Sequence, residues 1–204
     1  MEGNRGQFRL AGWVLLAFAA TYESIAGWIY VTGDPQNFDF IFRAKYLVYL
    51  PLVVTHGTCS IVALASGPWQ FLDGLRQKWP RLHRSLGYAY LSGVLVGSLT
   101  GLAMASMAEG GLSARVGFVV MASLWFVTGI LALTTARRGD YRAHRAWMVR
   151  NFALTFGAVM LRIYLHALEH IGFEFHQVYG LTTWLGWLPN LIFAEVLLRG
   201  DRAK

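Results

Sequence analysis

Four ionisable side chains lie inside long apolar segments of this sequence: Glu23, His56, Arg162 and Glu195. An ionisable group in hydrocarbon is costly, so a membrane-spanning segment retains one only where it has a partner or a function. At a rise of ~1.5 Å per residue, Glu23 and Arg162 lie ~20 Å and ~24 Å from the same membrane face. The matched depths predict a structural ion pair. His56 lies in mid-membrane, as a candidate ligand or as a neutral imidazole bonded to a nearby hydroxyl.

Two further histidines lie at matching depth near that face, on two helices that run in the same direction. His83 and His144 belong to a repeated R-x-H-R pattern, at Arg81–Arg84 and Arg142–Arg145. Because a haem b needs two imidazoles from facing helices and cations for its propionates, His83 and His144 are candidate axial ligands. Either could instead pair with His56. The candidate propionate-binding residues are Arg84, Arg145 and Arg150.

The same region admits two other interpretations. Glu195 lies about one helical turn from this face, so His83, His144 and Glu195 could hold a divalent metal. Such a metal would activate water to hydrolyse a membrane-borne substrate. Alternatively, the His-Arg pairs anchor helices at the lipid headgroups, and the chain is a non-catalytic subunit. These residues leave open whether the protein is an enzyme.

The elements that must position these residues are apolar segments long enough to cross a membrane. Hydrophobic residues make up 55% of the 204 and charged residues 14%, whereas a soluble domain carries about a quarter charged. A transmembrane helix needs ~20 mostly apolar residues. Six segments qualify: Leu10–Val31, Tyr46–Ser66, Ser85–Met107, Val116–Ala136, Ala146–Leu168 and Leu181–Leu198. The sequence therefore predicts an all-α bundle of six transmembrane helices, forming a single domain over residues 1–204.

The basic residues predict an orientation. Counted on alternate sides of six spans, 14 of the 18 Lys and Arg residues fall on the side of both termini, 3 on the opposite side and 1, Arg162, within a helix. The positive-inside rule therefore predicts that both termini are cytoplasmic. Because these residues flank the helices, as an anionic leaflet favours, the net charge of +7 does not indicate nucleic-acid binding.

Small and amphipathic residues predict how the helices pack. Gly93, Gly97 and Gly101 form a doubled G-x-x-x-G, which favours a close helix–helix seam within the bundle over a dimer interface. The segment Gly67–Pro80 mixes aromatic and charged residues at helical spacing, which predicts an amphipathic helix on the inner membrane surface. One polar stripe on the fifth span is expected to face the bundle interior or a wet cavity; its residues are Asn151, Thr155, Arg162, His166, Glu169 and His170.

Three motifs carry a resemblance to a known family. They are R-x-H-R-x-x-G-x-x-Y at Arg81–Tyr90, H-R-x-W-M-x-R at His144–Arg150, and W-x-x-W-x-P-N-L-x-x-x-E at Trp184–Glu195. Over roughly residues 45–198 the chain resembles a bacterial family of predicted multi-pass membrane proteins, the domain of unknown function twenty-three-zero-six. The resemblance implies a helical membrane fold in the bacterial inner membrane and no established reaction. In general plan such a bundle also resembles membrane cytochromes b, which favours haem-dependent electron transfer with a quinone or another membrane redox protein.

Overall fold

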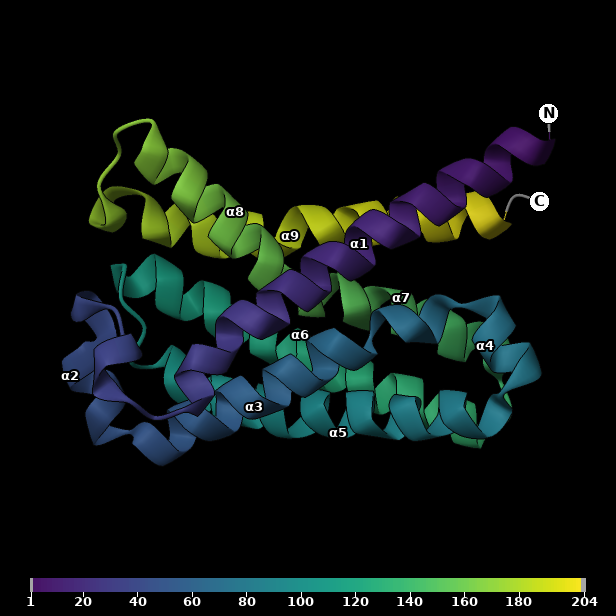
Figure 1. Cartoon of the computed structure of the whole chain (residues 1–204), viewed down its shortest axis with the longest axis horizontal. Helices are drawn as coiled ribbons and strands as arrows, with labels where there is room; N and C mark the ends of the chain where they lie inside the picture. The colour runs from purple at the N-terminus through teal and green to yellow at the C-terminus, as the bar shows by residue number, and fades with distance from the viewer. Residues whose placement is uncertain (1, 203–204) are drawn as a thin grey trace.

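The computed structural model describes residues 2–202 and contains only helices and connecting loops within them (Figure 1). The long helices are α1 (Glu2–Val31), α3 (Leu50–Ser66), α5 (Pro80–Ala105), α6 (Gly111–Arg137), α7 (Tyr141–Thr155), α8 (Gly157–His170) and α9 (Phe175–Arg202). Short helices connect them: η1 (Pro35–Asn37), α2 (Phe40–Val48), η2 (Pro68–Phe71) and α4 (Asp73–Lys78). Because α7 and α8 follow one another as one span, the described chain has six helical segments long and apolar enough to cross a membrane, which confirms the predicted fold class.

The helices run alternately in opposite directions along one long axis. Figure 1 shows that α1 begins and α9 ends at the end of the bundle where α4 lies, and that α2 lies at the opposite end. We call these the terminal end and the distal end. The span predicted at 46–66 begins at Leu50 in the structure. The residues before it form a separate helix, α2, which ends at Val48, and α3 follows with Pro51 in its first turn. Tyr46 therefore belongs to α2.

The segment predicted as one amphipathic helix forms two short helices at the terminal end. Pro68 begins η2, and Leu72, in an extended conformation, separates it from α4. The exposed indoles of Trp69 and Trp79 flank α4, and Arg76 pairs with Asp73 on its surface. The amphipathic character is therefore present, while the single continuous helix is replaced by η2 and α4.

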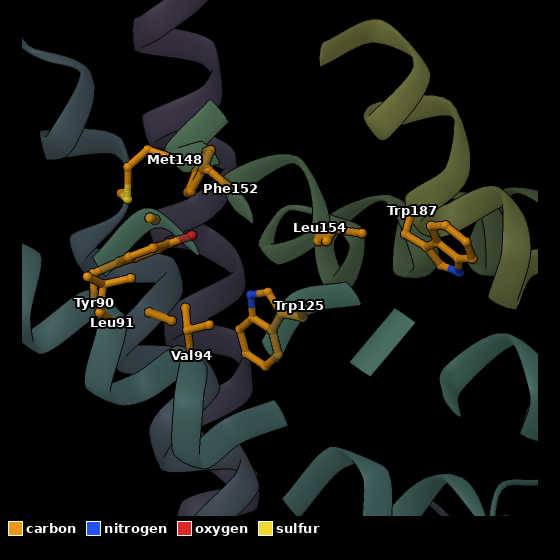
Figure 2. Packing of buried hydrophobic residues seen from close by; sticks show 10 residues of the cluster. Tyr90, Leu91, Val94, Trp125, Met148, Phe152, Leu154 and Trp187 are labelled. Atoms are coloured by element: carbon orange, nitrogen blue, oxygen red, sulfur yellow. The ribbon is translucent and has the colours of Figure 1, made fainter. Parts of the chain in front are cut away.

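A buried polar network joins α5, α6 and α7 inside the hydrophobic core. Figure 2 shows the packing of this core, whose Tyr90 and Trp125 also belong to the network. The hydroxyl of Tyr90 donates to Oδ1 of Asn151 at 2.6 Å and lies 2.9 Å from Oγ1 of Thr155. The indole of Trp125 donates to the same Thr155 oxygen at 2.8 Å, and the Asn151 amide donates to Oγ1 of Thr128 at 2.7 Å. Because Tyr90 and Asn151 are completely buried, these mutual hydrogen bonds offset the cost of removing them from water.

The glycines of the doubled G-x-x-x-G form a seam inside the bundle. A Cβ atom on Gly93 would lie 2.6 Å from the carbonyl oxygen of Cys59, so α5 and α3 touch there through their backbones. A Cβ atom on Gly97 would lie 3.1 Å from the Trp125 ring, and one on Gly101 would lie 3.1 Å from the His56 ring. The predicted packing seam is confirmed, and the two C-terminal glycines of the motif make room for aromatic side chains.

Candidate functional site: a cavity at the distal end

A cavity of about 460 Å³ occupies the distal half of the bundle. Residues of α1, α2, α3, α5, α6, α7, α8 and α9 line it. Its lining runs along α3 from Val53 to Leu64 and along α9 from Phe175 to Trp187, distances of ~16 Å and ~18 Å at the helical rise per residue. The cavity therefore reaches from the distal end to the middle of the spans.

Aromatic rings form much of the wall. The lining includes Tyr30, Phe42, Tyr46, Phe118, Trp125, Phe175, Tyr179 and Trp187. Phe175 stacks on Tyr179 with ring centroids 4.4 Å apart, and Phe42 stacks on Tyr46 at 5.3 Å. Burial, reinforced by nearby acidic groups, raises the pKa of the Tyr46 hydroxyl, so that side chain is neutral at physiological pH. The wall is therefore mainly flat, uncharged and apolar.

The matched depths of Glu23 and Arg162 do produce an ion pair. Nη1 of Arg162 on α8 contacts Oε1 of Glu23 on α1. The guanidinium also lies 5.6 Å from the centre of the Tyr30 ring, which is a cation–π geometry. The Glu23 side chain is only 10% exposed and that of Arg162 is 33% exposed. Both residues line the cavity, so the pair both ties α1 to α8 and places a guanidinium at the cavity wall.

A second ion pair lines the cavity at the distal end of the bundle. Lys45 of α2 pairs with Glu109, in the loop between α5 and α6, and also donates to the carbonyl oxygen of Met107 at 2.8 Å. Sequence reasoning placed Lys45 in the flank of the second predicted span and missed this pair. The separation along the chain is 64 residues, so no local periodicity could indicate it. The pair holds α2 across the distal end.

His56 lies in the cavity lining, and both of its ring nitrogens have neighbours. Nδ1 lies 2.9 Å from the carbonyl oxygen of Gly97 and 3.3 Å from Oγ1 of Thr100. Nε2 lies 3.4 Å from Oγ of Ser60, one helical turn further along α3. Since Gly97 and Gly101 lack side chains, the imidazole lies directly against the α5 backbone. His56 is therefore held by α5 at one edge and reaches the cavity.

The predicted polar stripe of the fifth span is divided between the core and this cavity. Asn151 and Thr155 are buried, and Thr155 also lines the cavity floor. Arg162, His166 and Glu169 line the cavity further toward the distal end of the bundle. His166 lies 3.4 Å from the Glu169 carboxylate. The stripe therefore faces the interior from Asn151 to Arg162, as its spacing predicts. At its far end the prediction is wrong, because His170 is exposed and does not line the cavity.

His83 and His144 lie at the terminal end and are not part of the cavity lining, to which His56 belongs. The two imidazoles are near enough to interact electrostatically. Nδ1 of His144 is 2.8 Å from the carbonyl oxygen of Ala132, whereas Nδ1 of His83 is buried without a hydrogen-bond partner among the described residues. His83 and His144 therefore lie at the same end of the bundle, within electrostatic range of each other, and His56 lies at a separate site. The adjacent Arg84 and Arg145 are exposed.

Glu195 has a different partner from the one the metal hypothesis requires. Arg150 donates to it through two nitrogens, from Nε to Oε1 at 2.5 Å and from Nη2 to Oε2 at 3.0 Å. Arg150 also lies 4.7 Å from the centre of the Trp147 ring. Within residues 2–202 no group of three His, Cys, Asp or Glu side chains could hold a metal ion. The three-ligand arrangement of His83, His144 and Glu195 is therefore not formed, because a bidentate ion pair engages Glu195.

Comparison with known proteins adds a family and no reaction. Neither the curated proteins nor the solved structures give a significant match to this chain. One family model matches residues 53–198, which include the seam, the core network, His56 and all three sequence motifs. Because this match covers well over half of the sequence, the chain belongs to the family described as predicted membrane protein (DUF2306).

Proposed function

We propose that this protein binds an amphipathic small molecule within the membrane, in the distal cavity. The observation that carries this proposal is one cavity lined by aromatic rings together with His56 and the Glu23–Arg162 pair. Small-molecule sites are typically apolar cavities of roughly 300–1,000 Å³ with a few polar groups that orient the ligand. The volume of about 460 Å³ lies within that range.

The placement of the charged groups supports binding over a purely structural role. In a purely structural ion pair each charged side chain needs only the other, so both side chains could be completely buried. Arg162 instead keeps a third of its side chain exposed while Glu23 is nearly buried. A guanidinium has five N–H donors, and those not used by Glu23 are available to a molecule in the cavity.

The charge distribution supports a location for the protein. Most Lys and Arg residues flank the spans on the side of the termini. We therefore propose a multi-pass protein of the bacterial inner membrane with both termini in the cytoplasm. In that orientation the distal cavity lies in the periplasmic half of the bundle.

Electron transfer through haem b is a second candidate function, favoured by the position of His83 and His144 at the same end of the bundle and by the buried Nδ1 of His83, which has no hydrogen-bond partner among the described residues. In this candidate function the imidazoles of His83 and His144 would hold the haem, and Arg84 and Arg145 would bind its propionates. The hydrogen bond from His144 Nδ1 to a backbone carbonyl is of the kind that orients ligand imidazoles. A membrane quinone would be a suitable redox partner. This site lies at the terminal end, so it involves residues different from those of the cavity.

Mass spectrometry of small molecules extracted from the purified protein tests the cavity proposal. We expect a co-purifying amphiphile with the wild type and its loss in Ala158→Trp, because Ala158 lines the cavity and an indole would fill part of it. Gly12→Trp is the matched control, since Gly12 is exposed and a Cβ atom there would have open space around it. An identical extract from Ala158→Trp and the wild type would contradict binding in this cavity.

Absorption spectroscopy of the same preparation tests the haem candidate. A Soret band that is lost in His83→Leu and in His144→Leu, but kept in His56→Leu, would support the terminal site. A band that depends on His56 alone would place the haem in the distal cavity instead. A spectrum without a Soret band after reconstitution with haem would contradict both placements.

A further inference from the structure

The hydrogen-bond partners of His56 determine which nitrogen of its ring carries the proton. The carbonyl oxygen of Gly97, 2.9 Å from Nδ1, can only accept a hydrogen bond. Nδ1 must therefore be protonated and donate. A charged imidazolium is costly in mid-membrane, so the ring is neutral. In a neutral imidazole with Nδ1 protonated, Nε2 holds a lone pair and acts as an acceptor.

The Nε2 edge of the ring is turned away from α5 and toward Ser60, which also lines the cavity. The distance of 3.4 Å from Nε2 to the Ser60 hydroxyl is at the long limit for a hydrogen bond. This contact therefore satisfies the lone pair only weakly. A molecule in the cavity that donates a hydrogen bond at this point would gain a better-placed acceptor in a water-poor environment.

From this geometry we infer that the cavity ligand is an amphiphile whose polar end is a hydroxyl group on an aromatic ring, as in a phenol or a quinol, donating to Nε2 of His56. The inference rests on the proposed binding function and specifies its ligand class. A carbonyl or ether oxygen has no proton to donate, so its lone pair and that of Nε2 would repel each other. The ring of such a ligand suits a wall built from Tyr30, Trp125 and Tyr179, since aromatic pairs gain from offset or edge-to-face contact.

Three probes of similar size test separately the need for a hydrogen-bond donor and the need for an aromatic ring. They are para-octylphenol, its methyl ether para-octylanisole, which is larger by one carbon, and trans-4-octylcyclohexanol, each titrated calorimetrically into the protein in lipid nanodiscs. We expect the wild type to bind the phenol about tenfold more tightly than the ether, the effect of one hydrogen bond to an acceptor that is otherwise only weakly satisfied. We expect the phenol also to bind more tightly than the cyclohexanol, because only the phenol has an aromatic ring.

Variants assign the effect to His56. In His56→Leu the preference for the phenol over the ether should disappear, and in His170→Leu, which changes an exposed histidine of the same chain, it should persist. Ala158→Trp should weaken binding of all three probes. Equal binding of phenol and ether to the wild type, with binding still lost in Ala158→Trp, would overturn the donor inference and leave the cavity function standing. Binding of all three probes unaffected by Ala158→Trp would overturn both.

A spectroscopic measurement keeps the inference testable if His56→Leu does not fold. In protein labelled with ¹⁵N at histidine, the Nδ1 resonance of His56 should show a bonded proton and the Nε2 resonance should not. Adding para-octylphenol should shift the Nε2 resonance, and para-octylanisole should leave it unchanged. A protonated Nε2 with an unprotonated Nδ1 would overturn the inference. In the calorimetric titrations, equal binding of the phenol and the cyclohexanol would overturn the part of the inference that the ligand carries an aromatic ring.

Discussion

Replacing either member of the Glu23–Arg162 pair should destabilise the protein, and Arg162→Gln should do so more than Glu23→Gln. Arg162→Gln leaves a carboxylate whose side chain is only 10% exposed, and breaking a buried pair in this way costs ~3–5 kcal/mol. Glu23→Gln leaves a guanidinium that is a third exposed and still lies over the Tyr30 ring. Partial hydration and the cation–π contact should reduce that cost to ~2 kcal/mol.

Thermal unfolding in detergent, followed by tryptophan fluorescence, measures both effects. For a chain of this size each kcal/mol corresponds to ~2–4 °C in Tm, so we expect losses of ~6–20 °C for Arg162→Gln and ~4–8 °C for Glu23→Gln. The double variant removes both charges and leaves two neutral amides. It should be more stable than the sum of the single effects by ~1–3 kcal/mol.

The exposed pair of Asp73 and Arg76 is the matched control. Its side chains are 77% and 54% exposed, so Arg76→Gln should change the stability by less than ~1 kcal/mol. If the effects of Glu23→Gln and Arg162→Gln add within ~0.5 kcal/mol, the two residues are not energetically coupled. A larger loss for Glu23→Gln than for Arg162→Gln would refute the assignment of the cost to the more deeply buried carboxylate.

The core, the seam and the charge pattern each give one further prediction. Asn151→Leu should lower the free energy of unfolding by ~2–3 kcal/mol, because the Tyr90 hydroxyl loses a buried partner; unchanged chemical denaturation would contradict this. Gly93→Ala should sharply lower the yield of monodisperse protein in size-exclusion chromatography, since its Cβ would lie 2.6 Å from a backbone oxygen, whereas Gly12→Ala, with open space around it, should not; equal yields would refute the seam. A reporter fused to the C-terminus should be active only in the cytoplasm, and periplasmic activity would reverse the proposed orientation.

The sequence alone was sufficient for the spans and for the relations that depend on depth. Each span shows in its own composition, because in lipid a helix satisfies its backbone hydrogen bonds within the segment. The Glu23–Arg162 pair could be predicted because the helical rise converts residue counts into depth, and a charge at that depth needs a partner. The glycine seam could be predicted for a related reason, since close approach in lipid requires small side chains at a fixed spacing.

The depth of a side chain in the membrane does not determine its position within the membrane plane. Only the tertiary structure decided which side chains of equal depth are in contact. Glu195 was expected beside His83 and His144, but because α7 packs against α9, Glu195 forms an ion pair with Arg150. Lys45 pairs with Glu109, 64 residues further along the chain. Residues of eight helices line the cavity, and no sequence pattern predicts that combination. The physical reason is that hydropathy and helical periodicity are local properties of one segment, whereas a binding site in a bundle depends on how several helices are turned about their own axes.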